Sequence, residues 1–313
     1  MKILFLAPDY LNLHIPIIKE LEKEGHKVHY IKDKMFTFDW HYPYLGYHDK
    51  FFKCLKASIN HPFKKYWINI IKEDSEIIQY YDIFLCINGC SFNKVLLKHI
   101  KQINPTIKTI LYLWDNSKFY EYFHNAKYFD KVYTYDLEDS KKFHAKFLPF
   151  YWLNSNKENE NEIYDISIVG TNHDNRYEII KKIQQQIKNT NITYYFKILD
   201  KSLPENDIII HRAINIQECN DIIRKSKCIL DTDRESQTGT TPRLIWALAM
   251  NKKIITTNQY IKHMPFYNPQ NILIIDRNNP QIDLDFLKSK SIQTIHPEIK
   301  KLRIDYWIEQ ILE

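Results

Sequence analysis

Short apolar runs alternate with segments of helical periodicity through the first half of the chain. The runs predict β-strands at Lys2–Ala7, Lys27–Ile31, Asp82–Ile87, Lys108–Leu113, Lys131–Tyr135 and Phe147–Leu148. Apolar positions at helical spacing predict helices between them at Ile15–Glu24, Trp67–Tyr80, Phe92–Ile103 and Leu137–His144. Strands that alternate with helices in this way favour a parallel sheet covered by helices.

A polar run at residues 154–162 interrupts the pattern, because none of its nine residues is apolar. We interpret it as a linker. The alternation then restarts, with strands predicted at Asp165–Val169, Thr193–Leu199, Ile208–Ile210, Cys228–Leu230, Lys253–Thr256 and Ile272–Ile275. Helices are predicted at Arg176–Lys188, Ile216–Ser226, Pro242–Met250 and, to close the chain, about Lys300–Leu312.

The pattern therefore predicts an α/β protein with two domains of similar size. The first covers residues 1–153 and the second residues 163–297, followed by a closing helical segment at 298–313. The N-terminal apolar run is too short for a signal peptide, and no run approaches the roughly 18 apolar residues of a membrane span. The five cysteines include no CxxC pair, which favours reduced core residues and a cytoplasmic protein.

The net charge of +6 is concentrated in the first half, where residues 1–155 hold 22 lysines and 17 acidic residues. Within it, Met35–Trp67 combines eleven aromatic residues with lysines and histidines. Such a segment suits an anionic membrane surface, an acceptor groove in which rings stack on sugars, or a tightly packed insertion. The charge is lysine-based and lacks an arginine–aromatic motif, so we expect no nucleic-acid partner.

Glycine is scarce, with five in the chain, and so marks positions where a side chain does not fit. Gly25 follows the first predicted helix and is expected to cap it. Gly89, Gly170 and Gly239 are expected near the carboxyl ends of strands, where ligands of open α/β sheets bind. Tight turns are the simpler interpretation of each one taken alone.

All seven arginines lie in the second half, against 37 lysines overall. In a lysine-rich chain, arginine marks sites that need its planar fork of donors. Arg176 and Arg243 each open a predicted helix, where free N–H groups already favour an anion. With Thr240 and Thr241 they predict a site for a diphosphate.

Carboxylates near this site have two interpretations. Asp233 and Glu235 are candidates to accept sugar hydroxyls, or simply to cap the loop, and Glu218 is a candidate for ribose hydroxyls or an ordinary residue of a helix start. The sequence Asp231-Thr232-Asp233 is a nominal DxD, which holds a metal in one class of sugar transferases. The adjacent helix start carries its own phosphate donors, so we expect no metal and no cofactor beyond the co-substrate.

Several segments resemble bacterial glycosyltransferases of the GT-B class, in particular the CgeB-like and the lipopolysaccharide-core or O-antigen group. They are LDTDRESQTGTTPRLIWALAMNKKIITTN (residues 230–258), FYNPQNILIIDRNNP (266–280), YWIEQIL (306–312) and LYLWDN (111–116). The resemblance extends over most of the chain, but its specific motifs are concentrated after residue 226. The sequence departs from this group at one point. Many relatives carry a glutamate in the loop that binds the donor and a second glutamate seven residues later. Here Pro242 follows Glu235 at that distance, so retaining chemistry is not implied.

The resemblance implies two Rossmann-like domains that face each other across a cleft, with a nucleotide-diphosphate sugar held by the second and the acceptor by the first. It also implies that the closing helix packs back on the first domain. The implied donor sugar is a deoxyhexose such as rhamnose, or a heptose. The implied acceptor is a cell-surface glycolipid or polysaccharide of lipopolysaccharide core, O-antigen or capsule. The enzyme would then work at the anionic inner face of the cytoplasmic membrane.

An inverting transferase also needs a base for the acceptor hydroxyl. His14 follows the first strand and is one candidate, with Asp9 and Asp115 as alternatives. A second interpretation is a noncatalytic sugar-nucleotide-binding or surface-assembly protein that has kept the fold.

Overall fold

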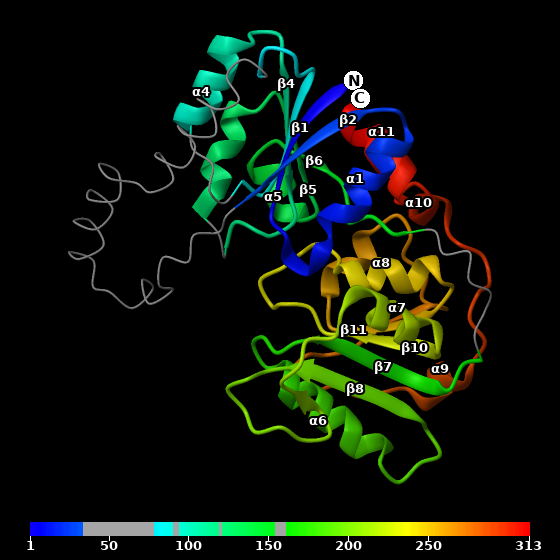
Figure 1. Ribbon diagram of the computed structural model, residues 1–313. Coiled ribbons are helices and arrows are strands. Elements are labelled where there is room, and N and C mark those ends of the chain that lie inside the picture. Colours follow the sequence, from blue (N-terminus) through cyan, green and yellow to red (C-terminus); the bar gives the residue numbers. More distant parts are fainter. Residues whose placement is uncertain (34–77, 90–93, 119–120, 154–160) are drawn as a thin grey trace. The chain divides into compact units, whose positions relative to one another are not determined.

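The computed structural model describes residues 1–33, 78–89, 94–118, 121–153 and 161–313 (Figure 1). The helix expected at Trp67–Tyr80, apart from its last three residues, and the whole aromatic and lysine-rich segment Met35–Trp67 lie outside this description. So does most of the linker expected at 154–162.

The described residues form two compact units. The first comprises Met1–Thr134 and Lys141–Lys146, and the second comprises Tyr135–Ser140 and Phe147–Glu313. The second unit thus begins earlier in the chain than the expected boundary at residue 153. No helix in the described ranges is long and apolar enough to cross a membrane.

The first unit is built on a six-stranded sheet with the order β2-β1-β3-β4-β5-β6. The pairs from β2 through β5 are parallel. The strands are β1 (Lys2–Ala7), β2 (Lys27–Lys32), β3 (Ile83–Ile87), β4 (Lys108–Leu113), β5 (Lys131–Thr134) and β6 (Lys146–Phe147). β1, β3 and β4 are buried along nearly their whole length, which explains why they are continuous apolar runs in the sequence.

The helices α1 (His14–Lys23) and α4 (Lys94–Ile103) lie on opposite sides of this sheet in Figure 1. Leu97 and Ile100 of α4 share a core with Leu4 of β1. A short α5 (Leu137–Lys142) follows β5, and 3₁₀ segments occupy Tyr10–Asn12 and Glu121–Tyr128. Gly25 has φ +81° directly after α1, so the expected helix-capping glycine is confirmed.

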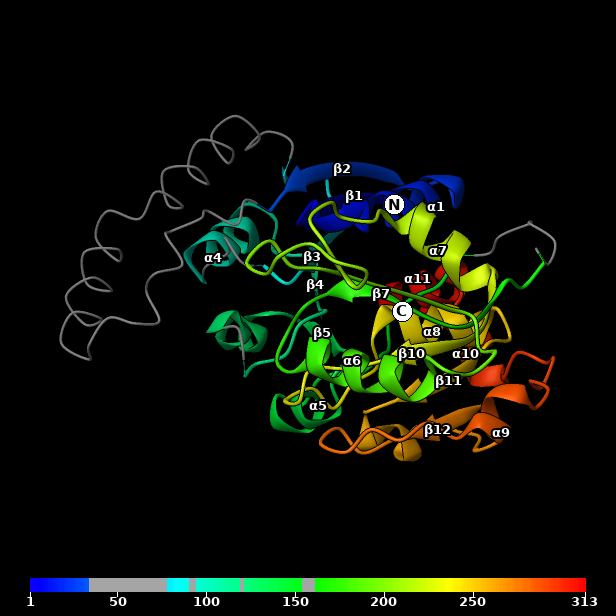
Figure 2. The same cartoon turned by 90° about the horizontal axis from the view of Figure 1, so that it is seen from below.

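The second unit contains another six-stranded parallel sheet, with the order β12-β11-β10-β7-β8-β9. Its strands are β7 (Tyr164–Thr171), β8 (Tyr194–Leu199), β9 (Ile209–Ile210), β10 (Ser226–Asp231), β11 (Lys253–Thr256) and β12 (Ile272–Ile274). In Figure 1, α6 (Arg176–Ile187) lies on one face, and α7 (Ile216–Arg224) and α8 (Pro242–Ala249) lie on the other. Figure 2, seen from below, places α6 in front of the strands. Both faces are therefore covered, as in a Rossmann-like domain.

The end of the chain differs from the expected single helix at Lys300–Leu312. The closing helix is present as α11 (Ile304–Leu312), but it begins four residues later than expected, and a separate short helix, α10 (Pro297–Lys300), precedes it. Trp152 N–H donates to the Leu302 carbonyl, and Ile304 N–H donates to the Trp152 carbonyl. This pairing uses backbone groups that a continuous helix would need for itself, so the helix is interrupted. The sequence pattern also contained no sign of α9 (Leu284–Lys288) or of a 3₁₀ segment at Gln259–His263.

The helix α11 packs on the segment Phe147–Trp152 within the second unit. Trp307 is fully buried, its indole N–H donates to the Pro149 carbonyl at 3.0 Å, and its ring meets Tyr151 edge-on at 5.2 Å. Trp246 of α8 donates to the Tyr151 carbonyl from the other side. The expected return of the closing helix to the first domain stays a prediction.

Candidate functional site

The carboxyl ends of β10, β11 and β12 form one edge of the second sheet. Ligands of open parallel α/β sheets bind beyond this edge. A pocket of about 260 Å³ lies there, in the loops that follow the three strands. Its lining residues are Asp233, Glu235, Gln237, Thr257, Gln259, Tyr260, Asp276, Arg277 and Asn278. This edge of the sheet is the candidate functional site.

The start of α8 follows β10 in the chain and contributes to this site. Thr241 caps the helix by accepting a hydrogen bond from Leu244 N–H at 3.2 Å, and Pro242 occupies the first turn. Thr240 is completely buried, and in the described part of the chain its hydroxyl finds no hydrogen-bond partner. A helix start of this kind, beside an unsatisfied buried hydroxyl, favours an anionic ligand.

Two guanidinium groups explain the glycine at position 170. A Cβ there would lie 2.9 Å from Nη1 of Arg243 and 3.4 Å from Nη1 of Arg176. A side chain at position 170 would therefore have to displace the guanidinium of Arg243, one of the two arginines singled out from the sequence. Gly170 lies inside β7 rather than after it, because the strand runs two residues further than predicted.

Arg243 is bound within the protein from two sides. Its Nη2 donates to Asp231 Oδ1 at 2.7 Å, and its Nη1 donates to the Val169 carbonyl at 2.5 Å. Asp231 is fully buried and also accepts a hydrogen bond from the Thr241 hydroxyl at 2.7 Å. The pair therefore ties the ends of β7 and β10 to the first turn of α8.

Arg176 is buried in a different way. It donates to the Thr232 hydroxyl at 2.8 Å and to the carbonyls of Thr171 and Thr232. All these partners are neutral, and no carboxylate of the described residues lies at ion-pair distance. Burial, and then the nearby charge of Arg243, lower the pKa of Arg176 to about 9. The group stays protonated at neutral pH. The charges of Asp231 and Asp233 act on it only from a distance, and both carboxylates pair directly with other guanidinium groups, those of Arg243 and Arg277.

The pKa of His173 is lowered as well. Burial is the main reason that its pKa falls to about 4, and the charges of Arg234 and Arg176 lower it further. The guanidinium of Arg234 lies 3.1 Å from the Nδ1 of His173. The imidazole is therefore neutral at pH 7.

Asp233 and Arg277 form a second buried pair at the pocket. Arg277 Nη2 lies 2.6 Å from Asp233 Oδ1, and the Thr257 hydroxyl donates to the same oxygen at 2.5 Å. Burial raises the pKa of Asp233 to about 6, against the lowering effect of these two partners. Sequence reasoning did not assign Arg277 or Thr257 to the site. The scarcity of arginine was the one signal for Arg277.

The two glutamates proposed from the sequence lie in different environments. Glu235 is exposed and lines the pocket. Glu218 lies at the start of α7, where it completes a capping box with Asn215 and pairs with Arg212 at 3.0 Å. The structure thus places Glu218 in a helix cap that is separate from the pocket lining.

The DxD carboxylates each pair with a guanidinium, Asp231 with Arg243 and Asp233 with Arg277. Across the described residues, no group of three histidine, cysteine, aspartate or glutamate side chains is arranged to hold a metal ion.

In the first unit, two of the three candidate bases follow β1 and the third follows β4. Asp9 follows β1 and pairs with Lys32, which lowers the pKa of Asp9. His14 begins α1 and stacks on Tyr30 with ring centroids 4.6 Å apart. Burial lowers the pKa of His14, so the ring is neutral at pH 7, and its Nδ1 has no partner among the residues described.

Asp115 follows β4. Its carboxylate accepts a hydrogen bond from the side-chain amide of Asn88 at 2.7 Å. Asn88 lies just beyond β3 in the left-handed region, with φ +60°, and its amide oxygen accepts from Trp114 N–H. Asn88 therefore fixes the loop that carries Asp115.

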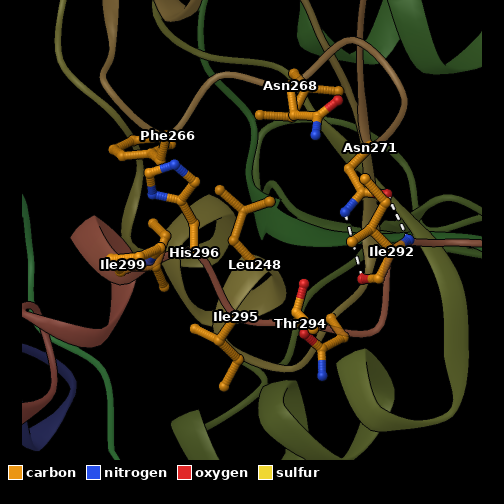
Figure 3. A pocket seen from close by; sticks show the side chains of 12 residues that line it. Leu248, Phe266, Asn268, Asn271, Ile292, Thr294, Ile295, His296 and Ile299 are labelled. Carbon is orange, nitrogen blue, oxygen red and sulfur yellow. Dashed lines mark hydrogen bonds between the residues drawn. The ribbon is translucent and has the colours of Figure 1, made fainter.

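A second pocket of the second unit, of about 320 Å³, lies at the opposite edge of the sheet, where β11 and β12 begin. Figure 3 shows its lining, in which Leu248, Phe266 and Ile292 lie beside Asn268, Asn271 and His296. None of its lining residues is an arginine, lysine or carboxylate. This pocket has no group to balance a diphosphate, which leaves the carboxyl edge as the better candidate.

No protein-family profile and no curated protein matches the sequence. Solved structures do match the fold. The crystal structure of Anabaena Alr3699/HepE in complex with UDP and glucose aligns with a TM-score of 0.56 at 9% identity, and covers 100% of this chain and 99% of that one. Arabidopsis thaliana UGT89C1 complexed with quercetin aligns with a TM-score of 0.48 at 10% identity, over 100% and 94% of the two chains. The likeness to the Anabaena protein, together with two parallel six-stranded sheets, shows a GT-B fold with two Rossmann-like domains.

Proposed function

We propose that this chain is a glycosyltransferase that takes its sugar from a nucleotide diphosphate bound at the carboxyl edge of the second sheet. Arg176 carries the proposal. Buried cations are normally paired, because an uncompensated charge is costly away from water. A diphosphate beside Arg176 would supply the missing negative charge. The similar Anabaena protein, whose crystal structure contains UDP and glucose, supports the same class of donor.

The start of α8 would stabilise the leaving group. Negative charge on the diphosphate grows as the bond to the sugar breaks, and fixed donors in a dry site stabilise that charge strongly. Gly239, Thr240 and Thr241 lie at this helix start, and the buried Thr240 hydroxyl is one such donor. Arg243 would act indirectly, since its guanidinium is already bound to Asp231 and to the Val169 carbonyl.

The donor's hydroxyl groups would be bound by the carboxylates of the pocket. Asp233 and Glu235 both line it, and carboxylates accept hydrogen bonds from sugar and ribose hydroxyls. Arg277 favours the ionised form of Asp233 at neutral pH, which keeps it an acceptor. Glu218 stays the proposed acceptor for the ribose hydroxyls alone, although it lies outside this pocket and its carboxylate already binds Arg212 and the Asn215 N–H.

The base would come from the first unit. His14 is the strongest of the three candidates, because it is neutral at pH 7 and retains an unpartnered ring nitrogen within the described structure. Asp9 is a weaker base while Lys32 holds its pKa down. Asp115 is the remaining candidate.

The resemblance of residues 230–258, 266–280 and 306–312 supports a narrower proposal. The enzyme would transfer a rhamnose-type deoxyhexose or a heptose, without a metal, to a glycolipid of lipopolysaccharide core, O-antigen or capsule. It would work in the cytoplasm at the inner face of the membrane. The lysine-rich first half of the chain supports contact with anionic lipid.

The test is a melting-temperature panel with UDP, GDP, ADP and dTDP and their sugars, because a ligand that binds only the native state raises this temperature. We expect one nucleotide series to stabilise the protein. Arg176→Gln keeps N–H donors but removes the charge. It should weaken the binding of that nucleoside diphosphate at least about tenfold, or ~1.4 kcal/mol. Arg303→Gln removes a cation at the start of α11, which does not line the carboxyl-edge pocket, and is the matched control. Equal losses in both variants, or no stabilisation of the wild type, would refute the proposal.

Binding without hydrolysis or transfer of the sugar would instead support the noncatalytic alternative. That outcome would keep the nucleotide site and remove the role of His14.

A further inference from the structure

The loop that leads into α8 is held by a segment about a hundred positions earlier in the sequence. Asp136, directly after β5, is buried and accepts two hydrogen bonds from Thr238. The Thr238 N–H donates to Asp136 Oδ2 at 2.9 Å, and the Thr238 hydroxyl donates to Oδ1 at 2.7 Å. Both residues belong to the second unit.

The next residue of the loop is held even more closely. A Cβ on Gly239 would overlap the Tyr135 carbonyl oxygen and lie 2.7 Å from the Tyr135 ring, which no side chain tolerates. The Gly239 carbonyl accepts a hydrogen bond from the Asn258 side chain at 2.8 Å. Thr238 and Gly239 are thus fixed immediately before Thr240 and Thr241, the start of α8.

Asp136 also caps α5, and this role has to be distinguished from its contact with Thr238. Its Oδ1 accepts hydrogen bonds from the N–H groups of Glu138 and Asp139 at 3.0 and 3.1 Å, so it caps the start of α5. Capping needs only Oδ1. The Thr238 N–H uses Oδ2, which a cap does not require.

We propose that Asp136 is a positioning residue of the donor site, which holds Thr238–Thr241 in the shape that receives the diphosphate. The inference rests on the proposed function. Electrostatic stabilisation depends on donors that are already in place when charge develops. A displacement of about 1 Å at such a site can cost a hundredfold in rate.

The substitution Asp136→Asn separates the two tasks. The amide oxygen still caps α5, but an NH₂ group replaces Oδ2 and faces the Thr238 N–H, so two donors oppose each other. The loop must shift to relieve this. We expect affinity for the nucleoside diphosphate identified by the melting panel, measured by calorimetry, to fall at least about tenfold. Hydrolysis of its sugar nucleotide, with water as the acceptor, should fall further.

Asp283→Asn is the matched control. Asp283 caps α9 by accepting from the N–H groups of Asp285 and Phe286, and it does not line the carboxyl-edge pocket. Because Asp283 is exposed, this variant should change the melting temperature of the unliganded protein less than Asp136→Asn, and it should leave nucleotide affinity unchanged. Thr238→Val removes the hydroxyl that donates to Asp136 and accepts from the Glu138 N–H, but it keeps the bond from the Thr238 N–H to Asp136. It should reduce affinity less than Asp136→Asn, and serves as the main variant if the latter does not fold.

The outcomes separate the two proposals. If the wild type binds no nucleotide of the panel, the proposed function fails. If the wild type binds but Asp136→Asn and Thr238→Val bind equally well, Asp136 is only a helix cap and this inference is overturned. A loss in these variants alone supports it.

Discussion

Arg243 illustrates at the level of one residue why arginine was retained in a lysine-rich chain. Its fork reaches Asp231 and the Val169 carbonyl at the same time, at 2.7 and 2.5 Å. A lysine keeps the charge but cannot make both contacts in this geometry. The sequence indicated that this position needs a fork. It could not indicate that the fork would bind Asp231 and the Val169 carbonyl within the protein.

We therefore expect Arg243→Lys to destabilise the unliganded protein by about 1–3 kcal/mol, the range for a disturbed buried network. Urea unfolding monitored by tryptophan fluorescence measures this. Nucleotide affinity in the fraction that stays folded should fall less than in Arg176→Gln. An unchanged midpoint of unfolding would contradict the structural role.

Asp233 predicts a pH dependence of stability. Because its pKa rises from 3.8 to about 6 on folding, the folded state binds the proton more tightly than the unfolded state. Its favourable contribution is present below about pH 4 and is lost as the pH rises to 6. Relative to Asp233→Asn, the free energy of unfolding of the wild type should fall by about 1.4 kcal/mol per pH unit between these two pKa values. If the melting temperatures of the two proteins change with pH in the same way between pH 4 and 7, the pKa of Asp233 is not raised.

The residues singled out from the sequence had unequal success. Gly170, Arg176, Asp233, Glu235, Gly239, Thr240, Thr241 and Arg243 gather at one edge of the second sheet, because each follows or ends a parallel strand. Their roles toward a ligand stay predictions. Arg277 and Asp136 were missed since their importance comes from partners more than forty and a hundred positions away, which no local pattern records.

At the level of elements, α8 depends on its cap. Thr241 accepts from Leu244 N–H and donates to Asp231. Thr241→Ala should cost about 1 kcal/mol of stability, as for other N-caps, and Thr241→Ser should restore most of it. Thermal unfolding of the three proteins measures the difference. Equal loss in both variants would mean that the methyl group, not the hydroxyl, matters.

The periodicity predicted most strands within one or two residues, because fully buried parallel strands are unbroken apolar runs. It misplaced the start of the closing helix. The residues 300–312 keep an apolar spacing typical of one helix, but Trp152 pairs with the backbone on both sides of Arg303. This partner lies about 150 positions earlier, so the break is a tertiary effect.

At the level of the whole molecule, alternation of strands and helices was sufficient to predict two α/β domains with parallel sheets, and the resemblance of the motifs implied that they are Rossmann-like. The order of strands was not, since it depends on crossovers that periodicity does not encode. The proposed donor site also relies on fixed cations. We expect sugar transfer or hydrolysis to survive EDTA, measured as release of nucleoside diphosphate. Loss with EDTA and rescue by magnesium or manganese would assign Asp231 and Asp233 to a metal instead.

The unpaired charge of Arg176 also has a consequence for turnover. A spent nucleoside diphosphate carries more negative charge than the sugar nucleotide from which it came, so the same cation should hold the product more tightly than the substrate. Departure of the product, rather than transfer of the sugar, would then limit the rate. We expect the inhibition constant of the free nucleotide to lie below the KM of its sugar, and Arg176→Gln to relieve the inhibition. In a cell, the rate of the reaction would depend on the ratio of sugar nucleotide to free nucleoside diphosphate. It would rise wherever a phosphatase removes the nucleoside diphosphate.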